Sequence, residues 1–145
     1  MRFAFPRALR FYMEKQLEDF IVHNWGKTEL GKKYDLIIED GELISQEYKT
    51  DIGSIDILAR NKETESYVVI ELKKNQTSDD TIGQLARHMG WTMDKKGDKN
   101  VRGIVIAADY DNKLEYALKV FQNVQVFLYK VNFTLEEFKV KETVQ

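Results

Sequence analysis

The segment that most constrains the fold is residues 101–108, which are almost wholly apolar. A strand that is apolar on both sides is buried on both faces, so it lies inside a sheet with helices packed above and below it. Helical apolar spacing begins near Ser78 before this segment, and it returns at residues 114–121, ahead of a further strand pattern at residues 124–131. This alternation of helices and strands predicts parallel pairing in the second half of the chain.

The first half of the chain has a different pattern. Apolar residues at helical spacing predict a helix over about residues 11–24, and residues 26–34 carry no period and predict a loop. Strand patterns at residues 43–49 and 55–59 flank a turn and predict an antiparallel hairpin, and residues 67–73 predict a third strand. We therefore expect an α/β fold with a mixed β-sheet flanked by helices, in the order αβββαβαβ.

The length of the chain, 145 residues, is that of one ordinary domain. We expect a single domain over residues 1–145, with a basic and aromatic arm at residues 1–12 and a tail at residues 132–145. Its 22 Lys and Arg residues are outnumbered by 24 Asp and Glu residues, so the net charge of −2 does not by itself predict a polyanionic partner. If nucleic acid is the partner, a local surface must attract it.

The residue types that are scarce also narrow the chemistry. There are no cysteines and only two histidines, so any bound metal is expected to be a hard cation held mainly by carboxylate oxygens. No apolar run approaches the roughly 20 residues that span a bilayer, so we expect no membrane segment. Arg7 and Arg10 interrupt the apolar stretch that a secretory signal needs, and a cytoplasmic location is expected.

Two acidic residues are predicted to meet on neighbouring strands. Glu71 and Lys73 end the third predicted strand, and because side chains alternate along a strand, both project to the same side. Asp56 is the single charge in an apolar strand segment, where an uncompensated charge is costly. If the two strands pair, Asp56 lies beside Glu71, and two adjacent carboxylates repel unless a cation or a proton lies between them.

This arrangement favours Mg²⁺ or Mn²⁺ as the cation, with Lys73 placed to orient or deprotonate a water, or to stabilise charge on a phosphate. Each piece also has a purely structural interpretation. Glu71 and Lys73 alone are typical of an ion pair near a strand end, and Asp56 alone is typical of a strand-end residue with its own hydrogen bonds.

The combined pattern of Asp56 and Glu71-Leu72-Lys73 resembles the PD-(D/E)XK nuclease superfamily. Over about residues 13–129 the chain is similar to the catalytic domain of the NucS/EndoMS endonuclease group, and the stretches that carry the likeness are residues 50–59, 69–74, 83–88 and 101–105. The resemblance implies a restriction-endonuclease-like core and a Mg²⁺-dependent phosphodiesterase that acts on DNA. It also implies that Asp56 and Glu71 ligate the metal and that Lys73 is the catalytic lysine.

Two helix residues complete the site that this resemblance implies. The leading helix of the family carries a glutamate in a Glu-x-x-Leu pattern, which here is Glu14, and Glu18 one turn later is its rival. The helix after the Glu-x-Lys strand carries a glutamine, which here is Gln84. We therefore expect Glu14 as a further metal ligand and Gln84 beside the metal-bound water, and we expect His88, one turn after Gln84, to be structural.

Cations near this site are candidate contacts to DNA. They are Arg87, which shares a helix stripe with Gln84, Lys74 after the Glu-x-Lys pattern, and Arg7 and Arg10 of the arm. Alternatively, the helix face that carries Gln84 and Arg87 is an ordinary solvent-exposed face with no role in binding. We expect DNA as the partner and no membrane, and we leave open a homodimer or a separate targeting subunit. The competing class is a module that keeps the nuclease fold for binding without turnover.

Overall fold

The computed structural model describes residues 16–74, 77–130 and 134–142. It begins with helical residues 16–23, followed by two short helices, η1 (Trp25–Lys27) and α2 (Glu29–Lys33). The longer helices are α3 (Ser78–Lys96) and α4 (Asn112–Leu118). The strands are β1 (Tyr34–Leu36), β2 (Ile38–Glu39), β3 (Glu42–Leu43), β4 (Gln46–Thr50), β5 (Gly53–Asn61), β6 (Tyr67–Leu72), β7 (Arg102–Ala107) and β8 (Val124–Leu128).

The main sheet is mixed, as the sequence pattern predicts. Its strand order is β1-β5-β6-β7-β8, and β4 also pairs with β5. The pairs β1·β5, β4·β5 and β5·β6 are antiparallel, whereas β6·β7 and β7·β8 are parallel because each is joined by a helix that crosses over the sheet. Strands β2 and β3 form a separate small hairpin. The predicted order αβββαβαβ was therefore incomplete, because β1, β2 and β3 precede β4 and are too short to show a strand period in the sequence.

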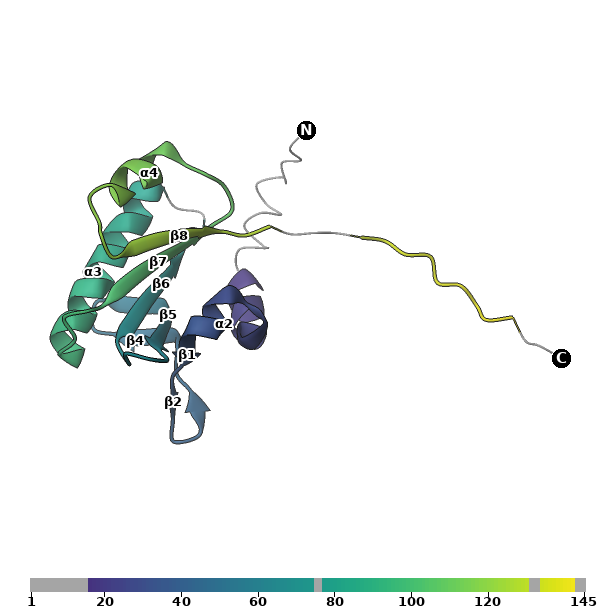
Figure 1. Ribbon diagram of the computed structural model, residues 1–145, viewed down its shortest axis with the longest axis horizontal. Coiled ribbons are helices and arrows are strands. Elements are labelled where there is room, and N and C mark those ends of the chain that lie inside the picture. Colours follow the sequence, from purple (N-terminus) through teal and green to yellow (C-terminus); the bar gives the residue numbers. More distant parts are fainter. Residues whose placement is uncertain (1–15, 75–76, 131–133, 143–145) are drawn as a thin grey trace.

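Helices cover both faces of the sheet (Figure 1). One apolar cluster joins the first helix and α2 to alternate residues of the central strands, among them Ile57, Ile70 and Leu72. The other cluster joins α3 and α4 to the opposite face, through residues such as Leu58, Val69 and Val105. Strand β7 contributes to both clusters, so it is buried on both faces as expected.

Helix α3 carries clear start and stop signals. The Thr77 side chain accepts a hydrogen bond from the Asp80 N–H, and acidic residues in the first turn suit the positive helix start. Gly97 ends the helix in the left-handed conformation at φ 62°. These local signals explain why the helix from Ser78 is predictable from sequence.

The prediction of a loop at residues 26–34 was wrong. The segment contains η1 and α2, and the Thr28 side chain caps α2 by accepting from the Gly31 N–H. Trp25 and Leu30 are buried in the core, and the Trp25 Nε1–H donates to the Tyr34 carbonyl at 2.8 Å. Helices this short show no helical period in sequence, and tertiary burial of these two side chains stabilises them.

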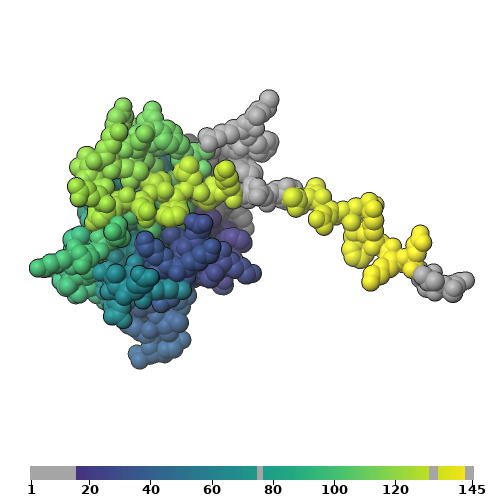
Figure 2. Space-filling model, viewed as in Figure 1, coloured from purple at the N-terminus to yellow at the C-terminus, as the bar shows by residue number. Residues whose placement is uncertain are grey.

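The predicted tail follows β8. Residues 134–142 are exposed and extended, and they project away from the body of the molecule (Figures 1 and 2). The predicted arm at residues 1–12 lies outside the described residues. No helix among the described residues is long and apolar enough to cross a membrane.

Candidate functional site

The site begins where β5 and β6 stop pairing. Their ladder ends at Ile57 and Ile70, one residue short of Asp56 and Glu71. Side chains then replace the missing backbone bonds: the Leu72 N–H donates to Asp56 Oδ2 at 2.8 Å, and the Asp56 N–H reaches Glu71 Oε2 at 3.5 Å. Asp56 and Glu71 therefore meet at the point where the two strands diverge.

In β5 the regular alternation of side chains between the two faces of the sheet is broken at Asp56. Ile55 and Leu58 pack on the α3 face of the sheet, whereas Ile57 packs on the other face. Asp56 also reaches the face of the first helix, where it contacts Lys74. The facing strand is irregular too, because Glu47 of β4 has a left-handed φ of 48°, a conformation that is uncommon for residues other than glycine. This irregularity lets the Glu47 side chain approach Asp56.

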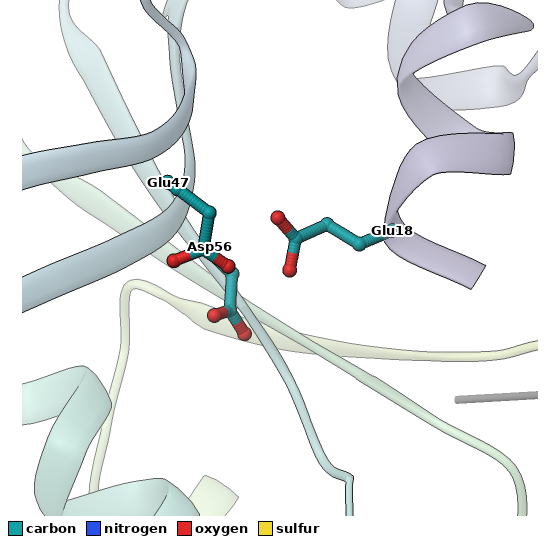
Figure 3. Close-up of side chains that lie close together, drawn as sticks. All are labelled: Glu18, Glu47 and Asp56. Atoms are coloured by element: carbon teal, nitrogen blue, oxygen red, sulfur yellow. The ribbon is translucent and has the colours of Figure 1, made fainter. Parts of the chain in front are cut away.

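Three carboxylates converge at this irregular point (Figure 3). Glu18 comes from the first helix, Glu47 from β4 and Asp56 from β5, and one oxygen from each lies within 4.8 Å of the others. The Lys74 ammonium contacts all three acids, with Nζ–oxygen distances of 3.0 Å to Glu18, 3.3 Å to Asp56 and 3.9 Å to Glu47. Glu18 and Asp56 are buried, so this lysine supplies the positive charge that their burial requires.

Glu71 faces helix α3. Its Oε1 shares a hydrogen bond with His88 Nδ1 at 2.5 Å, and its Oε2 accepts from the Gln84 side-chain amide at 3.2 Å. Glu71 and His88 are both buried, at 1% and 3% exposure. Both carboxylate oxygens of Glu71 are thus held in place by side chains of α3.

The electrostatics of the site favour protons or a cation. Burial raises the pKa of Glu71 to about 7, and the Asp56 charge adds to this effect although His88 opposes it. Loss of hydration also raises the pKa of Glu47 to about 7, helped by a hydrogen bond and repulsion from Glu18. Burial raises the pKa of Asp56 as well. Lys74 is partly buried, which lowers its pKa, but the surrounding carboxylates outweigh this and raise it.

An open cleft of about 420 Å³ leads to Asp56 and Lys74. It lies between Asp56 and Lys74 on one side and the first turns of α3 on the other, where Gln84 and Arg87 line it. Asp79 and Asp80 also line the cleft. A molecule in this cleft can therefore touch acidic, basic and amide groups together.

The structure brings together only part of the predicted site. Asp56, Glu71 and Gln84 lie together, and Arg87 lies at the cleft. By strand alternation Lys73 lies on the same face as Glu71, but among the described residues no ion pair joins it to Asp56 or Glu71. Hydrogen bonds from the Ser78 side chain and from the Lys113 N–H lower the pKa of Asp111, and the charge of Lys73 contributes to this effect. Lys74, predicted as a DNA contact, lies among the acids. Glu14, Arg7 and Arg10 fall outside the described residues.

Sequence reasoning missed two members of the cluster. The sequence pattern does not point to Glu47 as a site residue, because an acidic residue on an edge strand is normally solvated. Strict alternation places Lys74 on the other face of the sheet from Glu71, so the sequence did not group it with the acids. In the structure Asp56 turns to that same face and meets it. Glu18 was considered as the rival of Glu14, and the structure places it 3.0 Å from Lys74.

Comparison with known proteins finds similar sequences and structures. The family described as "Endonuclease NucS C-terminal domain" matches residues 14–132. The endonuclease NucS of Methanocaldococcus jannaschii is 35% identical over 85 residues, which are 59% of this chain and 32% of that protein. The NucS of Sulfolobus acidocaldarius is 33% identical over 94 residues, which are 65% of this chain and 33% of that protein. The chain thus spans about a third of these relatives.

Solved structures show the same fold. A repair endonuclease from Pyrococcus abyssi superposes with a TM-score of 0.63 at 18% identity, covering 90% of this chain and 49% of that one. An EndoMS–dsDNA complex gives a TM-score of 0.62 at 19% identity, covering 91% of this chain and 49% of that one. The mixed sheet flanked by helices is therefore shared with these structures.

Proposed function

Because this chain belongs to the family of endonuclease NucS C-terminal domains, we propose that it is a metal-dependent endonuclease that hydrolyses phosphodiester bonds in DNA. The observation that carries the proposal is the convergence of four carboxylates, Glu18, Glu47, Asp56 and Glu71, at one strand end beside an open cleft. Three of these acids, Glu18, Asp56 and Glu71, are buried, and carboxylates held this close repel one another unless a cation or a proton compensates them. Groups with strongly shifted pKa values gather at functional sites.

The residues of the cluster suit Mg²⁺ or Mn²⁺. These ions prefer oxygen ligands and usually bind through one or two carboxylates together with water and substrate phosphate. Asp56 is the central proposed ligand because it lies between Glu71, which its N–H reaches at 3.5 Å, and the carboxylates of Glu18 and Glu47, each with an oxygen within 4.8 Å of an Asp56 oxygen. Lys74 already places a positive charge against three of these carboxylates, so a cation suits this position.

The proposed reaction follows the PD-(D/E)XK pattern. A bound metal would polarise the scissile phosphate and favour ionisation of a water. Gln84 would help to position the attacking water, since its amide already lies against Glu71. Lys73 would take a proton from this water or neutralise charge on the phosphate, and Arg87 would bind a phosphate oxygen. The water oxygen bonds to phosphorus, the bond to the leaving sugar oxygen breaks, and that oxygen takes up a proton.

The proposal is tested by incubating the chain with supercoiled plasmid and with single-stranded DNA, in Mg²⁺, in Mn²⁺ and in EDTA. We expect cleavage that EDTA abolishes. Asp56→Asn and Glu71→Gln should remove it, while the matched control Glu42→Gln, on the exposed strand β3, should cleave like wild type. Salt-sensitive DNA binding without cleavage under any metal condition would favour the non-catalytic binding module instead.

A second comparison decides which lysine acts in the reaction. If Lys73 is the catalytic lysine, Lys73→Met abolishes cleavage, and Lys74→Met lowers it less because the metal can replace its charge among the acids. The opposite ranking would move the role to Lys74. Metal-induced changes in melting temperature should persist in both variants, which separates loss of chemistry from loss of metal binding.

The leading helix is tested in the same way. The resemblance assigns Glu14, whereas Glu18 contacts Lys74 within the acidic cluster. Glu14→Gln and Glu18→Gln are each expected to reduce cleavage on the order of tenfold to a thousandfold if the residue supports the site. The variant with the larger loss identifies the glutamate that serves the metal.

A further inference from the structure

The tail after β8 exposes large apolar side chains. Leu135, Phe138 and Val140 are 86%, 90% and 82% exposed, and no described residue covers them. The segment projects away from the body of the molecule (Figure 2). Three exposed bulky apolar residues within six positions are typical of a segment that binds another surface.

The end of this tail also alternates in the manner of a strand. Phe138 and Val140 are separated by Lys139, and Lys141 follows. In an extended chain the two apolar side chains project to one side and the two lysines to the other. Such a segment suits a receiving surface that has an apolar floor and an acidic rim.

The same chain carries a surface of this kind between α4 and β8. A groove of about 210 Å³ has a floor that includes Leu118, Val126 and Leu128, and acidic residues Asp109, Asp111 and Glu115 also line it. A cavity of roughly 150 Å³ accepts benzene, so this groove has room for one phenyl ring. Leu128 is 48% exposed in it.

The groove lies along an open sheet edge. Strand β8 is the last strand of the main sheet, and among the described residues no strand pairs with its outer side. An unpaired edge is a template for an added strand from another chain, in which backbone hydrogen bonds supply affinity and side-chain pockets supply specificity. Residues 134–142 have the extended form that such pairing requires, as Figure 1 shows.

We propose that residues 134–142 of one copy dock on the α4–β8 groove of a second copy, with Phe138 in the groove and Lys139 and Lys141 against its acidic rim. Residues 134–142 lie far from α4 of their own copy, as Figure 1 shows. Reciprocal exchange of two tails uses the same surface on each copy and therefore closes as a two-fold dimer.

The first test measures the mass of the full chain in solution over a wide range of concentrations, by light scattering after size exclusion. We expect a dimer whose dissociation constant is weakened roughly tenfold or more by Phe138→Ser, as for a central apolar anchor. The matched control Tyr116→Ser removes an exposed aromatic side chain of α4 that lies outside the groove, and it should leave the dimer intact. A chain that is monomeric throughout, or a dimer unaffected by Phe138→Ser, would overturn the proposal.

The second test uses charge. Lys139→Glu with Lys141→Glu should weaken the dimer, and Glu115→Lys should weaken it as well. The three changes together in one chain should recover part of the affinity that the double variant loses, because Asp109 and Asp111 stay acidic. Failure of the triple variant to recover, while each parent remains folded by circular dichroism, contradicts the assigned contact. Lys119→Glu, a charge reversal outside the groove, is the control.

A third experiment identifies which copy supplies the tail. Carbodiimide cross-linking of a mixture of isotope-labelled and unlabelled chains should join Glu115 to Lys139 or Lys141 in mixed pairs. Cross-links confined to a single copy would show that the tail folds back on its own groove, and this would overturn the proposal. These measurements need no DNA or metal, so their failure would leave the proposed nuclease function untouched.

Discussion

The carboxyl group of Glu71 gives a quantitative prediction about stability. In the unfolded chain it ionises near its ordinary pKa of 4.5, whereas in the folded protein burial raises the pKa to about 7. Between these two values the folded state binds more protons than the unfolded state, so the free energy of unfolding falls as the pH rises. At about 1.4 kcal/mol per pH unit, the difference corresponds to about 3 kcal/mol lost once the pH is above 7.

The substitution Glu71→Gln should remove this contribution. We expect urea unfolding in EDTA to show that wild type loses about 3 kcal/mol more than Glu71→Gln between pH 4.5 and 8, because the amide does not ionise. Glu63→Gln, in the exposed β5–β6 turn, is the control and should follow wild type. Equal pH dependence in wild type and Glu71→Gln would refute the assignment of a raised pKa to Glu71.

Two further predictions concern metal binding and packing. Asp56→Asn removes one of the clustered charges, yet its side-chain oxygen can still accept from the Leu72 N–H, so the variant should melt at or above wild type in EDTA. Mn²⁺ at a hundred times its dissociation constant should stabilise wild type by about 2.7 kcal/mol and the variant by much less. A wild-type response to Mn²⁺ in this variant would argue against Asp56 as a ligand. Gly103→Ala should lower the free energy of unfolding by about 1–3 kcal/mol, because the added Cβ would lie 2.5 Å from the sulfur of Met89. Gly90→Ala, in helix α3, meets nothing within 4 Å and should raise the free energy of unfolding by roughly 0.5–1 kcal/mol. Chemical denaturation measures both variants, and equal effects would refute the packing argument.

Much of the architecture could be predicted from local patterns. The apolar run that forms β7 requires burial on both faces, and the capping residues and helical period of α3 are contained in a single stretch of sequence. The alternation of strands and helices then determines parallel pairing in the second half of the chain. The meeting of Asp56 and Glu71 also followed, because two adjacent strands place a limited set of residues side by side.

The remaining parts of the site depended on tertiary geometry. A period of two assigns side chains to faces, but it cannot show where that period fails, and here it fails at Glu47 and Asp56. That irregularity turns Asp56 toward the first helix, which brings it to Glu18 and Lys74 and leaves Lys73 on the other face.

What the sequence by itself determined was therefore the order of elements from β4 onward, the mixed sheet and the strand end at which Asp56 and Glu71 meet. Only the tertiary structure decided which carboxylates and which lysine share that space. The physical reason is that apolar periodicity records burial along one element at a time. The partners of a buried charge come from several elements, and their positions depend on how those elements diverge and pack.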